Sequence, residues 1–130
     1  MWDAINCARG FVEGKTQEIT FVGHSKGGAE AASAAVATNR NAYIFNPATS
    51  NLSDYSLSSA NYTADMTAFI VKGDIVNYME GWFSKPIDRV VYLPQQYGGG
   101  WRNKWVTTIG DRILNHLMPS VKKALIQGGY

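Results

Sequence analysis

The sequence predicts an α/β fold in which a mostly parallel sheet is flanked by helices. Three observations support this prediction. Short runs rich in β-branched and aromatic residues alternate with helical patterns along the chain. The first of these runs leads through a glycine-rich turn directly into an alanine-rich helix. The later strand patterns each end at turn-forming residues, namely Asn-Pro, Lys-Gly-Asp and Pro.

Size and composition are those of one domain covering residues 1–130. The 130 residues are 45% apolar and 12% aromatic, which is enough for one hydrophobic core. The net charge of +2 is too small to indicate a nucleic-acid-binding protein, and no run of like charges occurs. No cofactor is expected, and the sequence shows no cluster of metal-ligating residues.

The single cysteine and the hydropathy pattern provide information on the cellular location of the protein. Cys7 is the only cysteine, so no intrachain disulfide can form, and we expect a buried thiol in the first helix. No stretch approaches the roughly 18 apolar residues of a transmembrane helix. The first residues do not resemble a signal peptide. By default we therefore expect a soluble, cytoplasmic protein.

The first helix is expected over residues 2–13, because Ile5, Ala8 and Val12 recur at helical spacing. A polar connector then leads into a strand at 19–22, where β-prone residues form a continuous run. A glycine interrupts that run, which is how a strand of a parallel sheet commonly ends.

The next helix is expected over 26–38, because its many alanines favour helix and let it lie close to a sheet. A strand at 42–45 should end before Pro47, which cannot donate to a ladder. Residues 48–64 are rich in Ser, Asn and Thr and are expected to form a loop. A third strand follows at 67–71.

In the last part of the chain a short helix is expected at 75–82 and a fourth strand at 88–93, which stops at a proline. Residues 95–104 contain three consecutive glycines and are expected to form an exposed loop. A final helical region covers 111–127, and Pro119 should break it near the middle.

The turn after the first strand carries the strongest functional motif. Gly23 and Gly27 flank Ser25 in a G-x-S-x-G pattern, the nucleophile elbow of serine hydrolases. A serine between strand and helix needs strained backbone angles and neighbours without bulk, which the two glycines provide. The amide of Lys26, at the start of the helix, is placed to stabilise an oxyanion.

A phosphate-binding P-loop is the competing interpretation of this turn. Gly23 and Gly28 have the required G-x-x-x-x-G spacing. Ala29 and Glu30, however, stand where that motif needs Lys and Ser or Thr. The P-loop is therefore rejected.

A serine nucleophile needs a base that an acid orients. His24 precedes Ser25 directly, so we expect its side chain to point away from the nucleophile, which leaves His116 as the base. Asp74 is the preferred acid because it follows a strand at the end of the sheet where α/β active sites gather. The other candidate acids are Asp54, Asp65, Glu80, Asp88, which opens a strand, and Asp111, expected as a helix cap.

With these residues the chain resembles the α/β-hydrolase superfamily and, within it, the class 3 lipase-like group. The elbow carries the resemblance, together with Asn46-Pro47 and the Val71 to Asp74 segment. The resemblance implies ester hydrolysis through an acyl-serine intermediate, with Ser25, His116 and Asp74 as the triad. Lys26 departs from the apolar residue usual after the serine in many lipases.

The superfamily fold has several strands before the nucleophile strand, and a loop there supplies the second oxyanion donor. Only 18 residues precede Ile19. We therefore expect the C-terminal half of a longer hydrolase, lacking the N-terminal strands. Loss of one oxyanion donor typically lowers kcat by about 10² to 10³. The exposed edge of the strand at 19–22 would favour homo-oligomers or pairing with a missing N-terminal segment.

Aromatic residues interleaved with cations lie before and after the fourth strand and are candidates for a lid or lipid-facing surface. Tyr97 and Trp101 are the expected substrate contacts. Ordinary loop and core aromatics are the plainer alternative, and single-stranded nucleic acid is disfavoured because there is no wider basic patch.

Three functional hypotheses stay open. The first is a serine hydrolase acting on lipid or other acyl esters. The second is a catalytically silent fragment or interaction module that keeps the elbow as a folding unit. The third, a thioesterase or peptidase, shares the triad and differs in the acyl donor.

Overall fold

The computed structural model describes residues 1–75, 87–98 and 109–130. Its strands form one parallel sheet in the order β1-β2-β3-β4, flanked by helices, which confirms the predicted α/β fold. The elements are α1 (Trp2–Val12), β1 (Thr20–His24), α2 (Lys26–Thr38), β2 (Asn41–Phe45), η1 (Leu52–Tyr55), η2 (Ser59–Asn61), β3 (Met66–Val71), β4 (Arg89–Leu93), α3 (Ile109–His116) and α4 (Met118–Gln127).

The strands and the first two helices lie within two residues of their expected bounds, and η1 and η2 are short 3₁₀ turns in the expected loop. The last helical region does break into two helices. The break falls at Leu117, and Pro119 lies in the first turn of α4, where its missing N–H costs no hydrogen bond. Most of the helix expected at 75–82 lies outside the described residues.

Helix α2 packs against β1 and β2 and builds the main core. Its alanines Ala31, Ala32 and Ala35 face the buried Ile44 of β2 and Met66 of β3. Because alanine side chains are short, the helix lies close to the sheet. Helix α2 begins directly after β1, with only Ser25 between them.

Helix α1 packs on α2 through Ile5 and Ala8, as the helical spacing predicts. The expectation of a buried Cys7 is wrong, since this side chain is exposed. Residue 7 lies off the stripe formed by positions 5 and 8, so it faces solvent. Among the described residues, no helix is long and apolar enough to cross a membrane.

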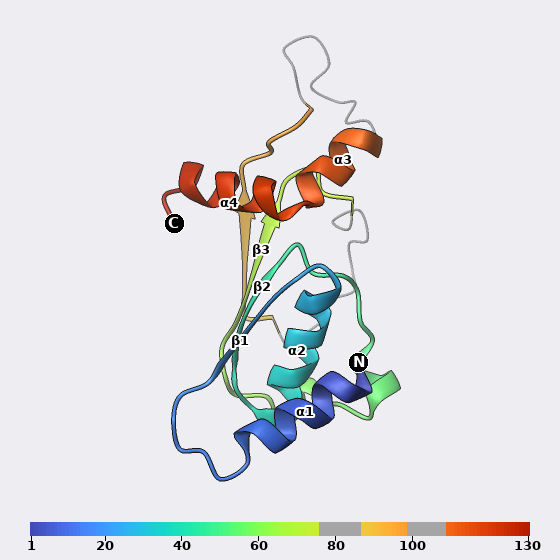
Figure 1. Cartoon of the computed structure of the whole chain (residues 1–130), viewed down its shortest axis with the longest axis vertical. Coiled ribbons are helices and arrows are strands. Elements are labelled where there is room, and N and C mark those ends of the chain that lie inside the picture. Colours follow the sequence, from blue (N-terminus) through green and yellow to red (C-terminus); the bar gives the residue numbers. More distant parts are fainter. Residues whose placement is uncertain (76–86, 99–108) are drawn as a thin grey trace.

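Helices α3 and α4 lie at the end of the sheet to which the strand arrows point (Figure 1). A second core cluster forms there, in which Val121 and Ala124 of α4 bury Val71 and Leu93, the last residues of β3 and β4. The four described strands are parallel, so their carboxyl ends share this edge. The end of α3 is thereby held over the strand ends that carry the candidate site.

Candidate active site

Ser25 lies at a sharp turn between β1, which ends at His24, and α2, which begins at Lys26. Its backbone has φ 55° and ψ −124°, a region that L-residues rarely occupy and that costs roughly 1–3 kcal/mol. The Ser25 amide donates to the Phe45 carbonyl at 3.1 Å, and its own carbonyl accepts from the amides of Gly28 and Ala29 at 3.0 and 3.2 Å. The surrounding backbone thus holds the strained residue in place.

The glycines around Ser25 differ in how much space a larger side chain would have. A Cβ at Gly23 would lie 2.0 Å from the Gly27 carbonyl oxygen, so no other residue fits there without moving backbone. At Gly27, by contrast, a Cβ would meet no described atom within 4 Å. The close approach on the helix side is at Gly28, where a Cβ would lie 3.0 Å from Pro47 Cβ. The expectation that Gly27 relieves crowding is therefore wrong, and Gly28 has that role.

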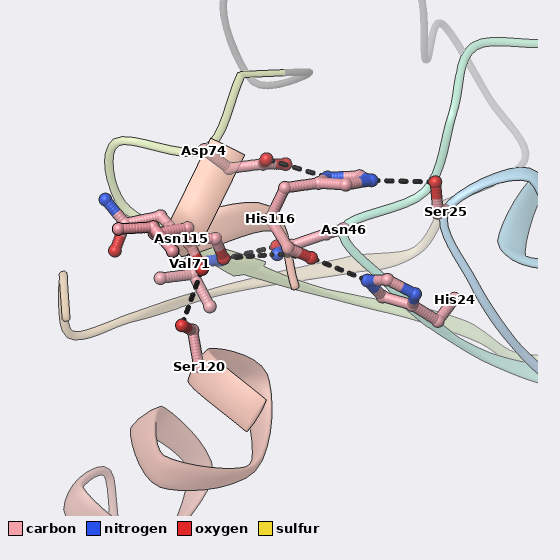
Figure 2. A network of polar contacts seen from close by, with 9 residues as sticks. His24, Ser25, Asn46, Val71, Asp74, Asn115, His116 and Ser120 are labelled. Carbon is pink, nitrogen blue, oxygen red and sulfur yellow. Dashed lines mark hydrogen bonds and ion pairs between the residues drawn. The ribbon is translucent and has the colours of Figure 1, made fainter. Parts of the chain in front are cut away.

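The structure brings Ser25, His116 and Asp74 together, although they are far apart in the sequence. The Nε2 atom of His116 lies 2.7 Å from Ser25 Oγ, and Nδ1 lies 2.8 Å from Asp74 Oδ1. Figure 2 shows the imidazole lying between the carboxylate and the hydroxyl. Because a carboxylate only accepts, Nδ1 carries the hydrogen and Nε2 is free to accept from the hydroxyl.

A tight turn after β3 places Asp74 at this position. The Asp74 amide donates to the Val71 carbonyl at 3.1 Å, and Gly73 has φ +81°, which glycine adopts without strain. The Asp74 side chain is only 1% exposed and that of His116 is 16% exposed. In such a water-poor setting, the interaction of the carboxylate with a charged imidazole is stronger than at the surface.

His116 is the last residue of α3, and polar side chains next to it in α3 and α4 bond to neighbouring backbone groups. Asn115 is fully buried. Its Oδ1 accepts from the amides of Gln96 and Tyr97 at 2.9 Å each, and its Nδ2 donates to the Tyr97 carbonyl at 2.9 Å. Ser120 Oγ donates to the Leu114 carbonyl at 2.6 Å. The Asn115 contacts connect the α3 end to the segment after β4, and the Ser120 contact connects it to α4.

Sequence reasoning missed two residues that contact the His116 backbone. His24 was expected to point away from the nucleophile; the feature that was missed is its contact with the backbone of His116. The Nε2 atom of His24 lies 2.7 Å from the His116 carbonyl oxygen. Asn46, which is 1% exposed, donates through Nδ2 to the Asn115 and His116 carbonyls at 3.0 and 3.3 Å, and its Oδ1 accepts from the Val71 amide at 2.8 Å. A polar residue directly after a buried strand was the one available signal for Asn46.

The remaining predicted residues lie as follows. Lys26 begins α2 beside Ser25, and its ammonium group is 3.6 Å from Glu30, with the side chain 85% exposed. Tyr97 is exposed, and its backbone bonds to Asn115. Trp101 lies outside the described residues. Its role and that of Tyr97 in substrate binding stay predictions.

Of the other candidate acids, Glu80 lies outside the described residues, and Asp54 accepts from Asn51 Nδ2 at 2.9 Å. Asp88 precedes β4 at the opposite end of the sheet, where its Oδ2 accepts from the Met66 amide at 3.0 Å. Asp111 lies within the first turn of α3, because this helix already begins at Ile109; the expected helix cap is wrong. In the parts of the chain that the structure describes, no group of three or more His, Cys, Asp or Glu side chains could hold a metal ion.

Comparison with known proteins identifies the family to which the chain belongs. A family model of phospholipase-like proteins, the Tle-like phospholipase domain, matches residues 3–123. A search of the curated proteins finds no match. The family match supports the lipase-like resemblance inferred from the elbow, while the narrower resemblance to class 3 lipases stays a prediction. The chain therefore belongs to the Tle-like phospholipase domain family, a phospholipase-like family of hydrolases.

Proposed function

We propose that this chain is a serine hydrolase of carboxylic esters, with phospholipids as the favoured substrates. One observation carries the proposal: His116 contacts Ser25 through one ring nitrogen, at 2.7 Å, and Asp74 through the other, at 2.8 Å. This is the arrangement that nucleophilic catalysis by a serine requires.

In the proposed mechanism, Ser25 Oγ attacks the ester carbonyl carbon while His116 Nε2 takes the hydroxyl proton. Asp74 stabilises the resulting imidazolium through Nδ1. The negative charge that develops on the carbonyl oxygen is stabilised by the backbone amide of Lys26. The tetrahedral intermediate collapses to an acyl-serine as His116 gives the proton to the leaving alcohol. Water then attacks the acyl-serine while His116 Nε2 takes a proton from it. His116 returns this proton to Ser25 Oγ as the carboxylic acid leaves.

The family supports a lipid ester as substrate, since the matching domain is described as phospholipase-like. Tyr97 and Trp101 are proposed as contacts for the acyl chain. Thioesters and peptides could react at the same serine by the same steps, because only the acyl donor differs. Comparing rates on an ester, a thioester and an amide with the same acyl chain distinguishes these three activities.

Release of fatty acid from phosphatidylcholine and phosphatidylglycerol vesicles tests the proposal. Ser25→Ala should lower the rate by at least about 10⁴-fold, because the nucleophile is lost. Ser53→Ala, which changes an exposed serine of η1, is the matched control and should keep the wild-type rate. Equal release by wild type and Ser25→Ala would rule out Ser25 as the nucleophile.

A second candidate function is supported by the edge of the sheet. Among the described strands, β1 pairs only with β2, and Val22 in β1 is 64% exposed. An apolar strand edge of this kind favours pairing with a second copy. In this alternative the chain is a catalytically silent interaction module that self-associates through β1.

Light scattering over a concentration series tests self-association. The module hypothesis predicts a dimer or larger species that Val22→Lys returns to the monomer, since a charge on an edge strand opposes pairing. A wild-type protein that stays monomeric at high concentration would contradict this candidate. Fatty acid release dependent on Ser25 would show that the module is not catalytically silent.

A further inference from the structure

The carbonyl oxygen of His116 accepts from two side chains that play no part in the proposed proton transfer. His24 Nε2 lies 2.7 Å from this oxygen, and Asn46 Nδ2 lies 3.3 Å from it. Figure 2 shows both contacts on the backbone of His116, below its imidazole. The shorter of the two comes from the residue that immediately precedes Ser25.

This contact joins the backbone of the base to the strand of the nucleophile. His116 is the last residue of α3, where helix carbonyls lack intrahelical partners. A side chain on β1 supplies the donor, so the separation between the α3 end and the elbow is fixed by a direct bond across 92 positions of sequence. Any drift of α3 away from the sheet must break it.

The contact also determines which ring nitrogen of His24 carries a hydrogen. A carbonyl oxygen only accepts, so the hydrogen bond needs a hydrogen on His24 Nε2. The two imidazole rings also pack against each other, with centroids 5.1 Å apart and planes tilted by 38°. His24 therefore restrains His116 at its backbone and along one side of its ring.

We propose that His24 is a positioning residue for His116: its Nε2–H holds the His116 carbonyl so that the imidazole stays within reach of Ser25 Oγ. This inference rests on the proposed function. It assigns His24 no proton transfer and no contact with the substrate. The predicted effect of losing it is thus on the chemical step and not on substrate binding.

Two substitutions separate the hydrogen bond from the packing. His24→Gln places an amide N–H close to the position of Nε2 and keeps a donor, whereas His24→Phe keeps a ring and removes the donor. Tyr43→Phe is the matched control, because Tyr43 is an exposed aromatic residue on the same face of the sheet, paired with Val22. The assay measures kcat and KM for a soluble ester and the rate at which a fluorophosphonate labels Ser25.

His24→Phe should lower kcat and the labelling rate by about three- to tenfold, the usual effect of one lost hydrogen bond, with KM unchanged. His24→Gln should stay within about twofold of wild type. Full rates in His24→Phe would overturn the inference while leaving the serine hydrolase intact. Equal losses in both variants would overturn the hydrogen-bond role, because packing alone would then explain them.

A measurement without turnover separates the inference from the proposed function. The imidazole N–H proton of His116 that bonds to Asp74 can be followed by proton NMR. It should remain sharp in wild type and in His24→Gln and broaden in His24→Phe, as His116 loses its fixed position. An unchanged signal in His24→Phe overturns the inference even if wild type proves inactive, whereas an inactive wild type with the expected signals contradicts only the proposed function.

Discussion

Replacing Asp74 by asparagine removes the charge beside His116 with almost no change in shape. The asparagine amide can donate to Nδ1, which would place the imidazole hydrogen on Nε2, facing Ser25 Oγ. In that tautomer the ring cannot accept the hydroxyl proton. The substitution therefore removes both the carboxylate that stabilises the imidazolium and the correct orientation of the base.

The size of the effect follows from the geometry. The Asp74 oxygen lies 2.8 Å from His116 Nδ1, and the carboxylate is 1% exposed. Charge centres about 4 Å apart attract by about 4 kcal/mol at an effective dielectric constant of about 20. That energy corresponds to about 10³ in rate. With the wrong tautomer added, the expected loss in kcat/KM is about 10³ to 10⁴.

The assay is hydrolysis of a soluble p-nitrophenyl ester, together with the rate of fluorophosphonate labelling, which needs no turnover. Asp88→Asn is the matched control: the same exchange at the opposite end of the sheet, where the amide oxygen can still accept from the Met66 amide. A loss below about tenfold in Asp74→Asn, or an equal loss in Asp88→Asn, would refute the role assigned to Asp74.

Three further outcomes are expected. Gly23→Ala should lower the free energy of unfolding, measured by urea denaturation, by about 3 kcal/mol or more, because its Cβ would lie 2.0 Å from the Gly27 carbonyl oxygen. Gly27→Ala should leave this free energy unchanged or raise it, and equal effects of the two substitutions would contradict the difference. Asn46→Ala should cost about 1–3 kcal/mol, since the buried Val71 amide loses its acceptor; unchanged stability would contradict it. Burial, with nearby carboxylates, raises the pKa of Tyr62 to about 12 from 10.0, so stability present below pH 10 should be lost as pH rises to about 12. Tyr62→Phe should flatten that loss in alkaline unfolding curves, and parallel curves would contradict it.

The elbow could be read from the sequence because its requirements are local. A β-prone run, a glycine that no larger residue can replace and an alanine-rich helix follow one another within 20 residues of chain, so the positions of β1 and α2 were predictable. Asp74 was found from a general property of parallel sheets, since a residue after β3 must lie at the shared carboxyl edge. His116 was found by elimination, because the sequence has only two histidines.

The supporting contacts could not be predicted, because they depend on how distant segments pack. His24 was expected to point away from the nucleophile because it immediately precedes Ser25. Its contact with the last carbonyl of α3 depends on where α3 packs, which the sequence does not show. Asn115 looked like any polar helix residue, although it is fully buried and bonds to the loop after β4. The role of Gly28 depends on contact with Pro47, which follows the neighbouring strand.

The most direct test of the central claim is to label the protein with a fluorophosphonate and map the adduct by peptide mass spectrometry. We predict one adduct, on Ser25, that is absent from Ser25→Ala and strongly slowed in His116→Ala. An adduct on a different serine, or labelling of Ser25→Ala at the wild-type rate, would contradict the account.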